Sequence, residues 1–247
     1  MISLRSDSNR RPTDYESVAL PTAPLRLNNQ IIIHKGDLLF KSEIYNTVET
    51  MEYNFFATIS RMKYIERWAL MRNSRNETLS EHSLEVAMIA HAFCVIGNTR
   101  YDRDLDADKA ALIGIYHDAS EIITGDMPTP VKYYNPEIRD AYKQVEMIAD
   151  FKLLEKLPAD IRPVYEEIFR GKDKADEKYM RRLVKAADKI SAYIKCIEEE
   201  KSGNTEFKTA KQSIGKKLEE LQAELPEVDD FVKEFLPSYG KTLDELS

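Results

Sequence analysis

The chain has 247 residues, of which 43% are hydrophobic, so it is long enough to bury the core of one large domain. Its formal net charge of −7 argues against a protein that wraps a nucleic acid polymer, because that function needs a broad basic face. A small anionic substrate held by a few local cations remains compatible with this charge.

No apolar run approaches the ~20 residues of a membrane span, and the N-terminus lacks the hydrophobic region of a signal peptide. We therefore expect a cytoplasmic protein without a membrane segment. The only two cysteines, Cys94 and Cys196, lie far apart in apolar helical contexts. Their expected state is a pair of buried free thiols rather than a redox or metal site.

Residues 1–50 differ from the rest of the chain. They contain three of the ten prolines, show no helical period and carry no net charge, so the whole −7 belongs to residues 51–247. One short apolar run, Gln30 to His34, is compatible with a strand. We expect these 50 residues to be a disordered or loosely attached extension. Alternatively, they precede the true start of the protein at Met51.

From Met51 onward the hydrophobic spacing is helical almost throughout. Phe55, Phe56, Ile59 and Met62 predict a helix that ends near Arg67 and Trp68. A Thr78–Glu81 capping box predicts the start of the next helix. This helix is expected to run to about Ile96 and to end at Gly97-Asn98, and another is expected from Asp106 or Asp108 to Gly125.

Two prolines two residues apart predict that Asp126 to Pro130 is a rigid, non-helical loop. The spacing then predicts four further helices, at about 136–157, 176–202, 205–225 and 227–236. No strand run, internal repeat or coiled-coil heptad is evident after residue 51. The expected fold of residues 51–247 is therefore all-α.

The stretch Gly114 to Thr129 holds the most informative residues. His117 and Asp118 are adjacent inside an apolar run, and Glu121 follows one helical turn later. An ionised carboxylate in a buried helix is costly unless a charged partner compensates it. The neighbouring histidine indicates that this partner is a metal ion.

His82 and Asp188 are the candidates for the remaining metal ligands. His91 lies nine residues after His82, on the opposite side of the same helix, so the two cannot serve one site. We expect His91 to be packed or on the surface, and His34 to be irrelevant. Asp188 lies in an inward-facing stripe with Val184, Ala187, Ser191 and Ile194. The alternative is that Asp188 forms a buried structural ion pair with Lys185 or Lys189. Both lysines, however, point elsewhere on the helical wheel.

Two imidazoles and two carboxylates suit a divalent first-row metal and leave one or two positions for water and substrate. Such an ion lowers the pKa of its bound water and neutralises a phosphate oxygen, as the hydrolysis of a phosphoester requires. Without further usable histidines, a mononuclear site is favoured over a dinuclear one.

The H…HD…D pattern resembles the HD-domain superfamily of metal-dependent phosphohydrolases. From Phe55 to its C-terminal end, the chain is also similar to the bacterial 5′-deoxynucleotidase family. The motifs that carry this similarity are Arg67-Trp68, SEHSLEVAMIAH (80–91), YHDASEIITGDMPTPVKY (116–133) and LVKAADKISAYIKCIEE (183–199). Of these, the GDMPTPVKY segment is more specific than the HD pair. Residues 1–50 lie outside the resemblance.

The resemblance implies an HD-domain helical bundle with a metal site between helices. His82, His117, Asp118 and Asp188 would bind the metal, which could be cobalt, manganese, zinc, magnesium or copper. Glu121 would be the general acid/base, and its spacing from His117 and Asp118 would place it on the same helix face. A solvated helix carboxylate is the alternative for Glu121.

The substrate-binding residues follow from the same resemblance. Arg67 would orient the phosphate, Trp68 would wall the sugar pocket and Asp126 would accept a hydrogen bond from a sugar hydroxyl. The 126–129 loop (Asp126, Met127, Pro128 and Thr129) would line the substrate, and His82, Asp118 and Asp188 would also contact it. A surface arginine and a core tryptophan are the alternatives for Arg67 and Trp68.

The expected reaction is hydrolysis of a deoxyribonucleoside 5′-monophosphate in the cytoplasm. The resemblance implies that the enzyme is a homodimer. One alternative is an HD hydrolase of guanosine tetraphosphate-type alarmones; those enzymes resemble HDxxED, and Ile122 replaces the final acid here. A second alternative is a catalytically silent HD-fold binding module. The retention of His82, His117, Asp118, Glu121 and Asp188 argues against it.

Overall fold

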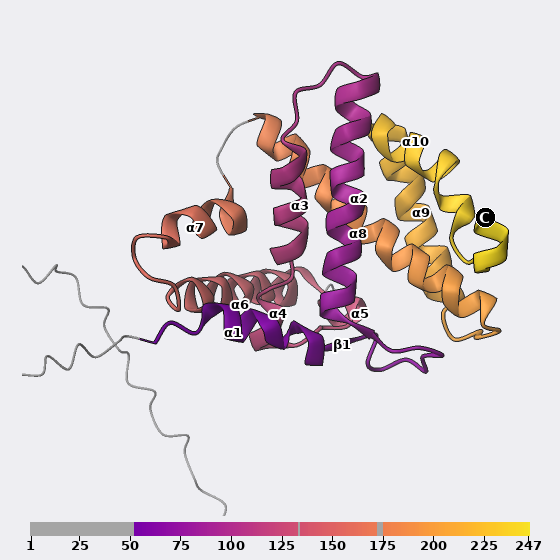
Figure 1. The fold of residues 1–247 in the computed structure, drawn as a ribbon. Coiled ribbons are helices and arrows are strands. Elements are labelled where there is room, and N and C mark those ends of the chain that lie inside the picture. Colours follow the sequence, from indigo (N-terminus) through magenta and orange to yellow (C-terminus); the bar gives the residue numbers. More distant parts are fainter. Residues whose placement is uncertain (1–51, 133, 172–174) are drawn as a thin grey trace, which may run out of the picture. The chain divides into compact units, whose positions relative to one another are not determined.

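A computed structural model describes residues 52–132, 134–171 and 175–247. The predictions for residues 1–50 and for Met51 lie outside these residues. The described elements, shown in Figure 1, are α1 (Phe55–Ile59), a 3-10 turn (Ser60–Tyr64), β1 (Glu66–Arg67), β2 (Glu77–Thr78), α2 (Leu79–Arg100), α3 (Ala107–Tyr116), α4 (Glu121–Thr124), α5 (Thr129–Lys132), α6 (Pro136–Leu154), α7 (Arg162–Arg170), α8 (Ala175–Lys201), α9 (Lys208–Glu224), α10 (Pro226–Glu234) and the 3-10 turns Leu236–Ser238 and Leu243–Leu246. The all-α prediction is confirmed.

The main core lies where α2, α3 and α8 pack together, with α9 and α10 on the other side of α2 and α8 (Figure 1). Gly114 lets α3 approach α2 closely, because a Cβ at this position would lie only 2.7 Å from the Cα of Ala87. This contact brings the end of α3 beside the start of α2. The N-terminal turn of α2 carries His82, and His117 follows α3 directly.

A smaller apolar cluster lies between α1, α6 and the segment that follows α3. It consists of Phe55, Ala119, Leu153, Leu154 and Leu157, all of them buried. Ala119 belongs to the turn that joins α3 to α4. The cluster therefore anchors the turn that holds His117 and Asp118.

The predicted helix from residue 106 to Gly125 is wrong in one respect that matters for the site. Asp106 caps α3 as expected, through its carboxylate and the amide of Lys109. However, α3 ends at Tyr116, a turn follows at 117–120, and α4 begins at Glu121. His117 Nδ1 donates to the carbonyl of Gly114, at 2.7 Å. This side-chain bond occupies the carbonyl that the amide of Asp118 would use in a continuing helix.

The first predicted helix is also shorter than expected. After α1 the chain tightens into a 3-10 turn and then pairs as β1 with β2, in an antiparallel register of Glu66 with Thr78 and Arg67 with Glu77. The expectation of no strand is wrong for this two-stranded ribbon. Its residues are joined by the Arg67–Glu77 ion pair, a long-range contact that local periodicity does not reveal.

Two predicted helix boundaries need correction, and one capping motif is confirmed. The Thr78–Glu81 capping box starts α2. This helix continues through Gly97 to Arg100, because Gly97 packs closely against Glu227 and Leu105. The loop predicted for residues 126–130 ends at Pro128, because α5 begins at Thr129. Pro130 lies in the first turn of α5, where a proline leaves no helical hydrogen bond unmade.

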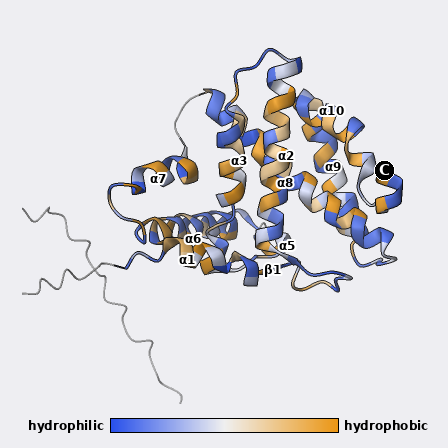
Figure 2. Ribbon diagram, viewed as in Figure 1, coloured by the Kyte–Doolittle hydropathy of each residue, from blue (hydrophilic) through white to orange (hydrophobic). Residues whose placement is uncertain are grey.

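Within the described residues, α2 is the one helix that is long and apolar enough to cross a membrane, although the sequence suggested that no run approached this length. Figure 2 shows hydrophobic residues along much of it. Of the most apolar 18-residue stretch of α2, 56% is buried inside the structure. The helix packs against α3, α8 and α10. These contacts identify it as a core helix.

Candidate active site

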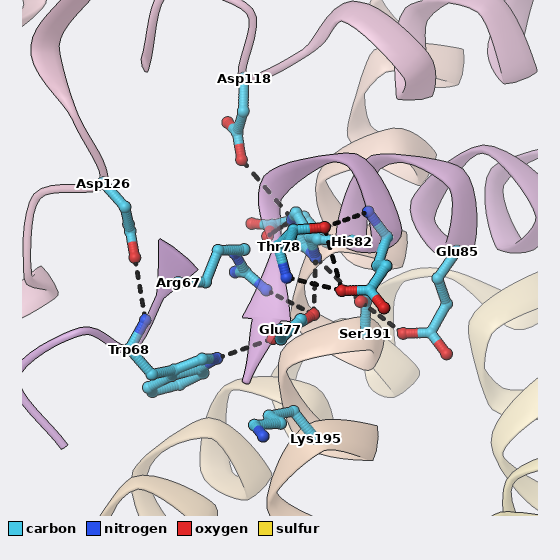
Figure 3. A network of polar contacts seen from close by, with 12 residues as sticks. Arg67, Trp68, Glu77, Thr78, His82, Glu85, Asp118, Asp126, Ser191 and Lys195 are labelled. Carbon is cyan, nitrogen blue, oxygen red and sulfur yellow. Dashed lines mark hydrogen bonds and ion pairs between the residues drawn. The ribbon is translucent and has the colours of Figure 1, made fainter. Parts of the chain in front are cut away.

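His82 lies at the centre of the candidate site, in the first turn of α2. Its side chain is fully buried, and its Nε2 atom lies 3.3 Å from Asp188 Oδ1 on α8 and 3.5 Å from Asp118 Oδ2 in the turn after α3. Three segments far apart in the sequence therefore meet at one imidazole nitrogen; Figure 3 shows the contact between His82 and Asp118.

His117 approaches the same point from the end of α3. Its Nε2 atom lies 3.0 Å from Asp118 Oδ2, and the two imidazole rings are 5.2 Å apart, centroid to centroid. Within the described part of the chain, neither Nε2 atom has a hydrogen-bond partner, although both are buried. Buried polar atoms are rarely left unpaired in folded proteins, so a ligand at this point would complete the site.

The donor set fits a divalent metal ion. One ligand atom each from His82, His117 and Asp118 lies within 4.8 Å of the others, and Asp188 Oδ1 adds a fourth donor beside His82. Nitrogen and carboxylate donors of this kind suit first-row divalent ions. Asp188 also accepts a hydrogen bond from Lys189, at 2.9 Å, so the expectation that Lys189 points elsewhere is wrong. The flexible lysine stem reaches back to the neighbouring carboxylate.

The electrostatics of the group also favour a cation. Burial disfavours a charged imidazole, but the Asp118 and Asp188 carboxylates outweigh it and raise the pKa of His117 to about 9. The pKa values of Asp118 and Asp188 are lowered despite their burial, chiefly by His117 and His82, respectively. The proton on His117 thus compensates part of the carboxylate charge, and a divalent ion would replace that proton on binding.

Glu121, the first residue of α4, is 6% exposed, and its Oε2 atom has no hydrogen-bond partner among the described residues. Burial, reinforced by the negative charges of Asp118 and Asp126, raises its pKa to about 9. The carboxyl group therefore carries a proton at neutral pH. Such a group can donate a proton to a leaving oxygen.

Arg67 and Trp68 are held together by Glu77, as Figure 3 shows. Arg67 Nη1 donates to Glu77 Oε1 and Trp68 Nε1 donates to Glu77 Oε2, both at 3.0 Å. Arg67 is 9% exposed. Its burial opposes the charge, but the carboxylates of Glu77, Asp188, Asp118 and Asp126 together raise its pKa. The guanidinium is therefore a fixed positive charge within an acidic site.

Trp68 adopts a left-handed backbone conformation, with φ at 59°, which is uncommon for a bulky residue. Its amide donates to Asp126 Oδ2 at 3.1 Å, and its ring packs edge-on against Phe207, 5.3 Å between centroids. Asp126 was expected to bind a sugar hydroxyl; one of its two carboxylate oxygens is already engaged by the protein. Met127 and Pro128 are half-buried and Thr129 is exposed, and their role in lining the substrate stays a prediction.

A cavity of about 520 Å³ adjoins the histidine–aspartate group. This volume lies within the usual range for small-molecule sites. It is lined by His117, Asp118 and Asp188 and by apolar residues of α3 and α7. The remaining lining residues are Tyr116, Asp150, Arg181, Val184, Lys185 and Lys189.

Several residues of the site were not anticipated from the sequence. Glu77 precedes the capping threonine and carries no local signal of its own. Ser191 contacts His82, and Glu85 contacts Ser191; the only hint was a hydroxyl in the inward stripe of Asp188. Of the residues expected outside the site, His91 lies on the protein surface near Asp108, and Cys94 and Cys196 are buried and free, as predicted.

Comparison with known proteins identifies the family. A sequence model described as 5′-deoxynucleotidase YfbR-like matches residues 54–239. The chain is 47% identical over 194 residues to a 5′-deoxynucleotidase of Erwinia tasmaniensis, and 46% identical over 194 residues to the 5′-deoxynucleotidase yfbR of Photorhabdus temperata. Each match covers 78% of this chain and 96% of the relative. The chain belongs to the YfbR-like 5′-deoxynucleotidase family.

A solved structure confirms the fold class. An HD-domain phosphohydrolase of Listeria innocua, lin2634, superposes with a TM-score of 0.65 at 24% sequence identity, over 75% of this chain and 88% of that one. This likeness confirms the HD-domain fold, and the family model with its relatives confirms the expected reaction class, a 5′-deoxynucleotidase.

Proposed function

We propose that the protein hydrolyses deoxyribonucleoside 5′-monophosphates to the deoxyribonucleoside and phosphate, with one divalent metal ion bound by His82, His117, Asp118 and Asp188. The observation that carries this proposal is the pair of buried Nε2 atoms that face two carboxylates and form no hydrogen bond within the described residues. Family membership supports the substrate class, since the relatives are named 5′-deoxynucleotidases.

The bound ion would supply Lewis-acid chemistry, polarising the phosphate and lowering the pKa of water. Two imidazoles with two carboxylates are compatible with cobalt, manganese, zinc or copper, and the carboxylates with magnesium as well. The four protein ligands we propose leave open positions for substrate and water. His82, Asp118 and Asp188 would then lie beside the substrate phosphate.

Arg67 would orient the phosphate. Its guanidinium is planar and permanently charged, and it is held by Glu77 rather than by solvent. A fork-shaped cation in a buried position binds two phosphate oxygens with a defined geometry.

Glu121 would supply the proton that the leaving group needs. When water attacks phosphorus and the bond from phosphorus to the 5′-oxygen breaks, that oxygen leaves as an alkoxide unless it is protonated. A carboxyl group with a raised pKa, buried near Asp118, holds a proton for this step.

The sugar would lie against Trp68, with Asp126 nearby. The indole is held by Glu77 and Phe207, and the backbone amide of Trp68 donates to Asp126. A rigid wall leaves no room or partner for an additional 2′-hydroxyl, which would favour deoxyribose. Met127, Pro128 and Thr129 would complete the lining of the substrate.

We further propose that the protein is a cytoplasmic homodimer. A row of apolar side chains on α6, formed by Val145, Ile148 and Phe151, is exposed and supports a contact with a second copy. Light scattering of the purified protein tests this part.

The test of the function is phosphate release from a panel of monophosphates that includes the four common deoxynucleotides, AMP and a guanosine tetraphosphate control. We expect phosphate from the deoxynucleotides, abolished by a chelator and by His82→Ala. Preferential hydrolysis of the alarmone, or no hydrolysis of any substrate by metal-loaded protein, would refute the proposal.

A further inference from the structure

His82 Nδ1, the ring nitrogen that does not face Asp118 and Asp188, takes part in a chain of two hydrogen bonds. His82 Nδ1 lies 2.9 Å from Ser191 Oγ on α8. The Ser191 hydroxyl in turn donates to Glu85 Oε2 on α2, at 2.6 Å. His82 and Ser191 are buried, at 1% and 0% exposure. Figure 3 shows the three side chains in this order.

The direction of these bonds sets the protonation pattern of the imidazole. A serine hydroxyl has a single hydrogen, and Ser191 directs it to the Glu85 carboxylate. Ser191 Oγ can then only accept from His82 Nδ1, which must carry the hydrogen. The lone pair of the neutral imidazole consequently lies on Nε2, the atom that faces Asp118 and Asp188.

We propose that Glu85 and Ser191 are positioning residues that fix His82 as its Nδ1–H tautomer, with Nε2 ready to bind a divalent metal ion. This inference rests on the proposed metal-binding role of His82. Partners of this kind orient a ligating histidine and increase its basicity. His117 obtains the same arrangement differently, since its Nδ1 donates to the backbone carbonyl of Gly114.

No nearer acceptor competes for His82 Nδ1 among the described residues. Glu77 Oε1 lies 3.8 Å from this atom, beyond hydrogen-bond range, and it already accepts from Arg67. Ser191 is therefore the contact that determines the tautomer.

The chain of bonds also joins the two helices that carry the site. Glu85 follows His82 by three residues on α2, and Ser191 follows Asp188 by three residues on α8. Residues three apart lie on one face of a helix. The Glu85–Ser191 bond thus locks the relative position of two faces, each with one proposed ligand.

The first experiment needs no substitution. Long-range ¹H–¹⁵N correlation spectra of the metal-free full-length protein at pH 8 report the tautomer of each of its four histidines. We expect the His82 hydrogen on Nδ1. A hydrogen on Nε2, or a mixture of both tautomers, would overturn the proposal whatever the enzyme hydrolyses.

The second experiment measures zinc affinity by competition with a chelating dye. Removing the hydroxyl in Ser191→Ala should weaken zinc binding by about 10- to 100-fold, the usual effect of losing such a partner, and should produce a mixture of His82 tautomers. Ser83→Ala is the matched control, because Ser83 is buried beside His82 but its hydroxyl has no hydrogen-bond partner within the described residues. The control should retain wild-type affinity, and thermal melts verify that both variants fold.

A double-mutant cycle then tests whether Glu85 acts through Ser191. Glu85→Ala alone should weaken zinc binding less than Ser191→Ala, because the serine can still contact His82. In the Ser191→Ala background, Glu85→Ala should add no further loss. Additive losses, or a Ser191→Ala variant with wild-type tautomer and zinc affinity, would overturn the proposal. Zinc binding that follows this pattern without phosphate release would instead refute only the proposed function.

Discussion

Arg67 and Glu77 lie directly opposite each other in the β1–β2 ribbon, and their side chains form an ion pair with 3.0 Å between Nη1 and Oε1. The other oxygen of Glu77 accepts from the indole of Trp68. The carboxylate of Glu77 therefore fixes both Arg67, which is proposed to orient the phosphate, and Trp68, which is proposed to contact the sugar.

This relationship predicts the effect of Glu77→Ala. Both Arg67 and Trp68 lose their shared partner, so the substrate is bound in poorer alignment, and kcat/KM for dAMP should fall by ~10²-fold, as expected for a small misplacement of reacting groups. The control is Glu66→Ala, in the same ribbon, whose carboxylate bonds to the exposed Asn76. Equal activity of the two variants would show that Glu77 does not position the site.

Asp188→Asn tests the metal site. The amide keeps the shape of the side chain but removes a negative charge next to His82, so the variant should lose the metal and the activity while its helical circular dichroism is unchanged. Asp108→Asn, a substitution at a surface position near His91, should keep both. Full metal occupancy in the Asp188 variant, measured by mass spectrometry, would exclude Asp188 as a ligand.

Glu121→Ala separates proton transfer from metal binding. The variant should keep its metal, because Glu121 is proposed to act on the leaving oxygen, and its kcat should fall by the ~10²–10⁴-fold typical of a lost general acid. Metal analysis and steady-state kinetics on the same sample check both parts. A variant that loses its metal would place Glu121 among the ligands instead.

Asp118 and Asp188 were predictable as ligands because carboxylates in apolar helical stretches are conspicuous. His82 was predictable because His91 lies on the opposite side of the same helix, and the structure brings His82, Asp118 and Asp188 together. The helical fold was predictable for a related reason, since the 3.6-residue period is a local property.

Contacts between distant segments were not predictable. Pairing of Arg67 with Glu77 depends on a ribbon of two residues per strand, too short to show an alternating pattern. The turn at His117 depends on one side-chain bond to a backbone carbonyl. Ser191 and Glu85 become meaningful only when α2 and α8 are packed together, because their separation in the sequence conceals the contact.

Asp150 gives a pH-dependent prediction. Burial, and then the charge of Glu146, raise its pKa to about 6, although Arg170 opposes the shift. The folded protein therefore holds this proton more tightly than the unfolded chain, in which an aspartate has a pKa of about 4. As the pH rises from the pKa of the unfolded chain to the pKa of the folded protein, ionisation of Asp150 reduces the free energy of unfolding. This reduction is complete above the folded pKa.

Asp150→Asn cannot ionise and avoids this loss. Its Tm should exceed that of the wild type by roughly 2 °C at pH 8, and the two values should converge at pH 4. Calorimetry at both pH values in the presence of a chelator checks the difference. A higher Tm of the variant at pH 4, with equal Tm values of variant and wild type at pH 8, would contradict the raised pKa of Asp150.

Discrimination between deoxyribose and ribose tests the proposed deoxynucleotidase function most directly. Trp68 is held rigidly by Glu77 and Phe207 beside Arg67, the residue proposed to orient the phosphate. The metal-loaded wild type should therefore have a much higher kcat/KM for dAMP than for AMP. In Trp68→Ala the two values should approach each other with the metal still bound. Equal kcat/KM values for dAMP and AMP in the wild type would contradict the proposed preference for deoxynucleotides.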